Sequence, residues 1–138
     1  MVIVDEVYQN VIFDLPDSEL VRLVERLIIV KEEDIEGLKE KINQYEQKRR
    51  KEKALYQSMS PLRRLFTGRP ASHHQAVEYM VHVKERFKKI DTIKSSIRVL
   101  ERVLEQMSRP DREVEQISLS PELIRELRLL RESEVMPQ

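Results

Sequence analysis

Apolar residues recur at alternating steps of three and four over two long stretches of the chain. In the first stretch these positions are Val21, Val24, Ile28, Ile35, Leu38, Ile42, Tyr45, Tyr56 and Met59. Such a heptad seam is typical of a helix that packs along another helix. Lys31 and two later charged residues interrupt the seam without changing its phase. Because Pro16 and Asp17 suit the first turn of a helix, the pattern predicts a first helix over residues 16–58.

The second stretch has the same periodicity and predicts a helix over residues 72–108. Its apolar positions are Ala76, Tyr79, Val83, Ile90, Ile93, Ile97, Leu100, Leu104 and Met107. Ser72 and Gln75 have the spacing of a capping box at its start, and Pro110 ends it. The connection between the two helices, residues 59–71, is short. A short connection between long helices favours an antiparallel hairpin.

A third helix is predicted over residues 121–133, after a linker of residues 109–120. Ser120 and Pro121 are a typical helix start. The helix is striped with apolar residues at Leu123, Ile124, Leu127 and Leu130. This stripe predicts that the helix packs against the base of the hairpin, where the first helix begins and the second ends.

The N-terminal segment, residues 1–15, gives two conflicting signals. Over residues 2–13, Ile3, Val7 and Val11 have helical spacing, but the β-branched content favours a strand. We expect a helix on the basis of the spacing. This segment should also pack at the base, where the first helix is apolar nearly all round its circumference because of Leu20, Leu23, Leu27, Ile28, Ile29 and Val30.

The expected fold is therefore all-α. It is a single helical domain, residues 1–138, built as a long antiparallel, coiled-coil-like hairpin with a short C-terminal helix and the N-terminal segment packed at its base. The composition agrees, since 36% of residues are charged, 5% are aromatic and only two are glycine. Away from the base each helix offers one apolar seam, which buries little surface alone. We therefore expect a homo-oligomer, formed by dimerisation into a helical bundle or by higher association.

The net charge is zero, but the charges are separated along the chain. Residues 1–47 carry 12 acids and 5 bases, residues 48–74 carry 8 bases and one acid, and residues 75–138 carry 12 of each. The bases of the middle window are Lys48, Arg49, Arg50, Lys51, Lys53, Arg63, Arg64 and Arg69. In the expected hairpin they all belong to the closed end.

A basic end of this kind suits an anionic partner. Guanidinium and ammonium groups, together with the free N–H groups at the start of the second helix, bind phosphate or carboxylate. Nucleic acid is the first expected partner, and Phe66 among the arginines would stack on an unpaired base. Two alternatives stay open: the charges are simply solvated and Phe66 closes the hairpin end, or the partner is an acidic protein or membrane surface.

One group of residues has the chemistry of a metal site. His74, Glu78 and His82 are spaced by four and share a helical face, and Glu52 should lie opposite them. Imidazole and carboxylate groups suit a divalent transition metal. However, the spacing matches neither the zinc-protease nor the di-iron motifs, and eight nearby cations oppose a metal ion. We keep these residues as metal candidates only, and expect no cofactor.

Other classes of function lack their residues. Without cysteine there is no disulfide or thiolate site. Two glycines do not make a phosphate-binding loop, and no serine lies in a nucleophile elbow. The longest apolar run, residues 27–30, is far shorter than the ~18 residues of a membrane span, and the N-terminus does not resemble a signal peptide.

We therefore expect a non-enzymatic, cytoplasmic helical interaction protein that self-associates and presents a basic hairpin end to an anionic partner. One alternative is a scaffold or assembly subunit that acts only through protein–protein contacts, in which the basic end meets the acidic residues 1–47 of a neighbour. The other alternative is a metal-binding helical bundle.

Overall fold

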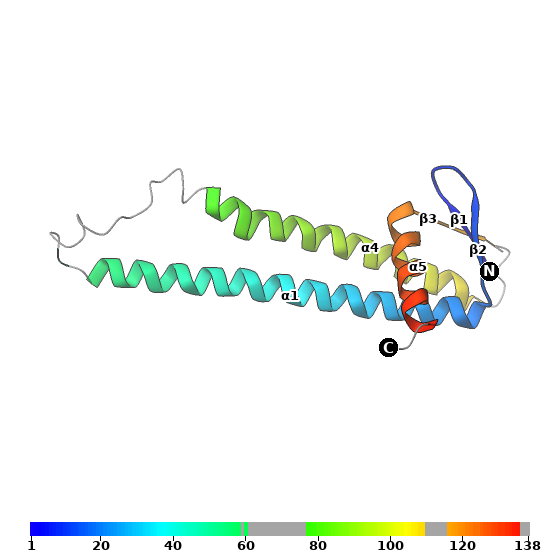
Figure 1. The fold of residues 1–138 in the computed structure, drawn as a ribbon, viewed down its shortest axis with the longest axis horizontal. Helices are drawn as coiled ribbons and strands as arrows, with labels where there is room; N and C mark the ends of the chain where they lie inside the picture. Colours follow the sequence, from blue (N-terminus) through cyan, green and yellow to red (C-terminus); the bar gives the residue numbers. More distant parts are fainter. Residues whose placement is uncertain (59, 61–76, 110–115, 136–138) are drawn as a thin grey trace. The chain divides into compact units, whose positions relative to one another are not determined.

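The structure, a computed structural model, describes residues 1–58, 60, 77–109 and 116–135. Its elements in chain order are β1 (Val2–Asp5), β2 (Val11–Asp14), α1 (Asp17–Ser58), η1 (Met80–Lys84), α4 (Glu85–Ser108), β3 (Gln116–Leu119) and α5 (Pro121–Val135) (Figure 1). Helices dominate, as the sequence predicts. The prediction of an all-α fold is nevertheless wrong, because three short strands form a sheet.

The chain divides into two compact units. Unit 1 comprises Met1–Glu33 and Ile93–Gln138, and unit 2 comprises Asp34–Thr92. Unit 1 therefore contains the sheet, α5, the N-terminal part of α1 and the C-terminal part of α4. Unit 2 contains the rest of α1 and the start of the second long helix. In that helix, residues 77–79 lead into η1, a π-helical turn that continues directly into α4.

The sheet of unit 1 has the strand order β2-β1-β3. β1 pairs antiparallel with β2, with Ile3 opposite Phe13, and parallel with β3, with Ile3 opposite Ile117. The expectation of a helix over residues 2–13 is wrong. Ile3 and Val4 point to opposite faces of the central strand, yet both are buried. Adjacent β-branched residues suit a strand that is covered on both faces.

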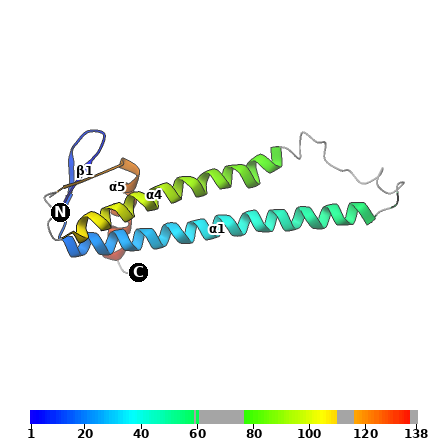
Figure 2. The ribbon, with the colours of Figure 1, turned by 180° about the vertical axis from the view of Figure 1, so that it is seen from behind.

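A tight turn between β1 and β2 explains why the helical spacing was misleading. The Asp5 carboxylate accepts hydrogen bonds from the N–H groups of Val7 at 2.7 Å and Tyr8 at 3.4 Å. Gln9 has a φ of 58°, in the left-handed region, and the N–H of Asp5 donates to the Asn10 carbonyl at 2.9 Å. These contacts reverse the chain. The turn joins the two strands in the blue hairpin seen from behind in Figure 2.

The expected linker over residues 109–120 contains β3. Ile117 and Leu119 are buried, whereas Gln116 and Ser118, which precede each of them, are exposed. This alternation is the signature of a half-buried strand. It extends over four residues only, which is too short to identify a strand from the sequence.

The long helix α1 buries the predicted seam at Val24, Ile28, Ile35 and Ile42. The other seam residues are half-buried, except Met59, which lies outside the described residues. The backbone N–H of Leu20 donates a hydrogen bond to the carbonyl of Pro16 at 3.0 Å. The helix begins at Asp17, as predicted from Pro16 and Asp17. The buried apolar residues of α1 are Leu20, Leu23, Val24, Leu27, Ile28, Ile35 and Ile42. Ile29 and Val30 are 54% and 38% exposed, so two of the apolar residues round the base of this helix are exposed in the single chain.

The third predicted helix is confirmed as α5. The Ser120 hydroxyl accepts a hydrogen bond from the Leu123 N–H at 3.3 Å, which caps the helix as its sequence indicates. Leu123, Ile124 and Leu127 are buried. The apolar face of α5 therefore forms part of the core of unit 1.

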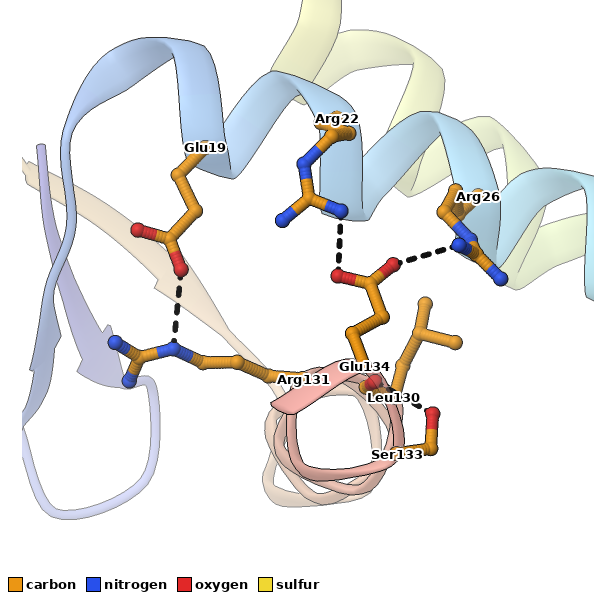
Figure 3. A network of polar contacts seen from close by, with 7 residues as sticks. All are labelled: Glu19, Arg22, Arg26, Leu130, Arg131, Ser133 and Glu134. Carbon is orange, nitrogen blue, oxygen red and sulfur yellow. Dashed lines mark hydrogen bonds and ion pairs between the residues drawn. The ribbon is translucent and has the colours of Figure 1, made fainter. Parts of the chain in front are cut away.

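Ion pairs surround the contact between α5 and α1 (Figure 3). Glu134 of α5 lies between Arg22 and Arg26 of α1, with its second oxygen 2.9 Å from Arg26 Nη1. Arg131 of α5 donates to Glu19 at 3.1 Å. The two helices are thus joined by ion pairs of both polarities, with an acid of α1 against a base of α5 and an acid of α5 against two bases of α1.

Lys31 is the buried exception within the seam of α1. Its side chain is 8% exposed, and its Nζ lies 2.7 Å from Oε2 of Glu126 on α5. The sequence indicated that this lysine interrupts the seam. Instead, the α5 carboxylate compensates its charge, which allows the aliphatic part of the side chain to fill the seam.

We predict that Glu126→Gln lowers the free energy of unfolding by about 1–2 kcal/mol, because Lys31 loses its counter-charge in a largely buried position. Lys31→Met removes both the charge and its desolvation cost, so it should leave stability unchanged or raise it. Urea unfolding measures both effects. Glu132→Gln, at an exposed position of α5, is the matched control. Equal stability of the Glu126 and Glu132 variants would contradict the prediction.

Candidate anion-binding site

The part of the predicted basic end that the structure describes is a continuous segment of α1, residues 48–53, which we call the basic stretch. Its five cations are all exposed. In the described part of the chain, none of them forms an ion pair or a side-chain hydrogen bond. They are Lys48, Arg49, Arg50, Lys51 and Lys53.

The helix spreads these cations round its circumference. Because successive residues of an α-helix advance by about 100°, the four adjacent cations 48–51 point in four different directions. The basic stretch is therefore a positive collar round α1 and not a stripe along one face. This geometry attracts anions from any side but does not present one ordered row of side chains to a groove.

Like charges lie close together in this collar. Arg49 and Lys53 are four residues apart, and Lys48 and Lys51 are three apart, so both pairs are neighbours on the helix surface. Each such pair destabilises an isolated helix by about 0.2–0.5 kcal/mol. Glu52 is the only acid among residues 48–53. Bound anions would relieve this repulsion.

The other predicted site residues lie outside the described residues. These are Arg63, Arg64, Phe66 and Arg69, together with the metal candidate His74. The expected closed end of the hairpin, residues 59–71, is described only at Ser60. The described part of the candidate anion site is therefore its α1 segment, residues 48–53.

A stacked ring pair lies further along unit 2. The rings of Tyr45 and His82 have centroids 4.7 Å apart and planes 14° apart. Arg86, one turn after His82, donates to the His82 carbonyl at 3.3 Å. The sequence placed Tyr45 on the seam but did not predict this partner, because His82 was assigned to a different face as a metal candidate.

The structure describes three of the four metal candidates, Glu52, Glu78 and His82. His82 and Glu78 are half-buried, and Glu52 is exposed. Among the described residues, no three His, Asp or Glu side chains are placed to hold a metal ion. The structure thus brings His82 together with Tyr45, and His74 stays outside the described part.

Sequence reasoning missed one extension of the positive charge. Beyond the predicted window, the start of the second helix carries exposed Lys84, Lys88 and Lys89. As a result, the described part of unit 2 has eleven bases against eight acids. This excess of bases does not show when acids and bases are counted over residues 75–138, because that segment as a whole carries equal numbers of each.

No protein-family model matches the chain, and comparisons with curated proteins and with solved structures find no similar protein. In the described part of the chain, no helix combines the length and the apolar character needed to cross a membrane.

We predict that Tyr45→Ala lowers the free energy of unfolding by about 2 kcal/mol, because it removes a half-buried ring and its stacking interaction. The stack also predicts ring-current shifts of the His82 ring protons, which NMR should show in the parent protein and not in the variant. Gln44→Ala, at the exposed neighbouring position, is the control. Unchanged His82 resonances in Tyr45→Ala would contradict the stacked arrangement.

Proposed function

We propose that this chain is a non-enzymatic helical interaction protein that self-associates and binds an anionic partner, nucleic acid first, through its basic stretch. The observation that carries the proposal is the set of five exposed cations within residues 48–53 that have no ion pair in the described part of the chain. Opposite charges three or four residues apart stabilise an exposed helix, whereas like charges at these spacings destabilise it. Here the bases accumulate at a cost to the helix, which an anionic partner would offset.

The collar geometry favours a polymer with regularly spaced charges. Phosphate contacts supply most non-specific affinity for nucleic acid and do not require that the protein presents a particular face. Side chains that point all round a helix cannot together enter one groove, so they suit contacts to the backbone and not to base edges. We therefore expect binding that is sensitive to salt and largely independent of base sequence.

The scaffold alternative uses the same collar with a different partner. Acidic side chains of a neighbouring copy, which are concentrated in residues 1–47, would replace phosphate. This alternative predicts that the mass of the assembly falls as salt rises, without nucleic acid. The two functions are therefore separable by the requirement for nucleic acid.

We predict that replacing Lys48, Arg49, Arg50, Lys51 and Lys53 together by Gln weakens binding to duplex DNA and single-stranded RNA at least about tenfold at low salt. Fluorescence anisotropy over a series of salt concentrations measures the affinity. The slope of log affinity against log salt should fall by about 0.9 for each duplex phosphate that the variant no longer neutralises.

The control removes the same charge from elsewhere. Its substitutions to Gln are at five exposed bases of unit 1, Lys94, Arg98, Arg102, Arg109 and Arg125. This variant should keep affinity within about twofold if the basic stretch supplies the contacts. An equal decrease in both variants would show that only net charge matters, and absence of binding by the parent protein would remove the nucleic-acid proposal.

A further inference from the structure

The face of α1 opposite its buried seam carries an ordered pattern of side chains. With about 100° per residue, one set of residues falls within a single exposed stripe. We call it the outer stripe; it consists of Ile29, Glu33, Glu36, Glu40, Gln44, Gln47, Lys51 and Leu55. All of these residues are exposed, including the apolar Ile29 at 54% and Leu55 at 60%. The steps between them are three or four, as on any single face of an α-helix.

The outer stripe is complementary to its own reverse. Residue 42 is the midpoint between Ile29 and Leu55, and it is also the midpoint between Glu33 and Lys51. Lys48 adjoins the stripe and lies as far from residue 42 as Glu36 does. If the stripe is read in the reverse direction, Glu33 and Glu36 are therefore replaced by bases and the two apolar ends exchange places. In the middle, Glu40 is opposite the uncharged Gln44.

We propose that two copies of the chain pair through the outer stripes of their α1 helices, antiparallel, about a two-fold axis near residue 42. Glu33 and Glu36 of each copy then meet Lys51 and Lys48 of the other, and Ile29 meets Leu55 at both ends. A two-fold axis repeats every contact, as in most homodimers. The proposal rests on the self-association within the proposed function and assigns it a surface.

A parallel pairing is disfavoured by the same charges. It would place Glu33 against Glu33 and Lys51 against Lys51, and like charges at close range oppose association. The buried seam is not available for this contact, because it is occupied within the chain. The outer stripe is thus selective for one direction.

Gly37 supports the assignment independently. It lies in the middle of α1, where glycine costs roughly 0.5–1 kcal/mol relative to alanine. A Cβ at this position would meet nothing within 4 Å, so the fold of a single chain does not require glycine here. Gly37 borders the outer stripe opposite position 47 of the second copy, where the absence of a side chain allows two helices to approach closely.

The test uses two charge-reversal variants of the full chain. One is Glu33→Lys with Glu36→Lys, and the other is Lys48→Glu with Lys51→Glu. Sedimentation velocity at low salt and over a range of protein concentrations measures self-association of each. Each variant alone should self-associate at least about tenfold more weakly than the parent, because every exposed ion pair becomes a repulsion.

Mixing the two variants provides the decisive result. One has bases at all four of these positions and the other has acids at all four, so together they should form a mixed dimer at least as strong as that of the parent. The chain that carries all four substitutions should also recover self-association. Failure of the mixture to associate, or self-association of the single variants equal to that of the parent, would overturn the pairing.

The same variants separate this inference from the proposed function. Glu33→Lys with Glu36→Lys abolishes pairing but retains the basic stretch, so its affinity for nucleic acid should not fall. If it binds nucleic acid and the mixture does not associate, the proposed anion binding stands and the α1 pairing is wrong. If the mixture associates and no variant or parent binds nucleic acid, the pairing stands and the anionic partner is not nucleic acid.

Discussion

The constraint on which the structure depends is that α1, a helix of 42 residues, must find neighbours for one apolar face from Leu20 to Ile42. A single helix cannot bury its own apolar face, and most of the stability of helices in proteins comes from packing that face against other elements. The chain meets this requirement with different neighbours along α1. In unit 1 the sheet, α5 and the end of α4 supply the core, whereas the described part of unit 2 has the start of the second helix and side chains such as His82.

In unit 1, where α5 packs against α1, the apolar face of α1 includes one charged residue, Lys31. Lys31 is buried because α5 brings Glu126 to within 2.7 Å of its ammonium group, and the ion pairs of Arg22, Arg26 and Arg131 lie round the same helix contact. Among the described residues of unit 2, no acid pairs with the basic stretch in this way. Bases at the contact between α5 and α1 are therefore paired, whereas the five cations of the basic stretch have no ion pair within the described residues. This contrast supports the proposal that the basic stretch is a binding surface and not a packing element.

The helices could be predicted from the sequence because a periodic pattern over dozens of residues averages out local exceptions, and their start signals at Pro16 and Ser120 are strong. The strands could not. β1 is buried on both faces, so Ile3 and Val4 show no alternation, and β3 alternates over only four residues. The turn at Asp5 depends on a side-chain hydrogen bond and a left-handed Gln9, neither of which has a periodic signature. For the site, the cations and their exposure followed from composition, but the Tyr45–His82 stack required knowledge of how two helices face each other.

Because the basic stretch encircles α1, anion binding and self-pairing are linked. The proposed pairing uses Lys48 and Lys51, and it leaves Arg49, Arg50 and Lys53 directed elsewhere. A polyanion that contacts all five cations must displace the acids of the second copy from two of them, whereas one that contacts only the other three need not. A ligand that binds the single copy more tightly than the paired copy weakens pairing. By linkage, pairing lowers the affinity for that ligand by the same factor by which the ligand lowers the affinity of pairing. The direction of this coupling therefore reports which cations the anionic partner contacts.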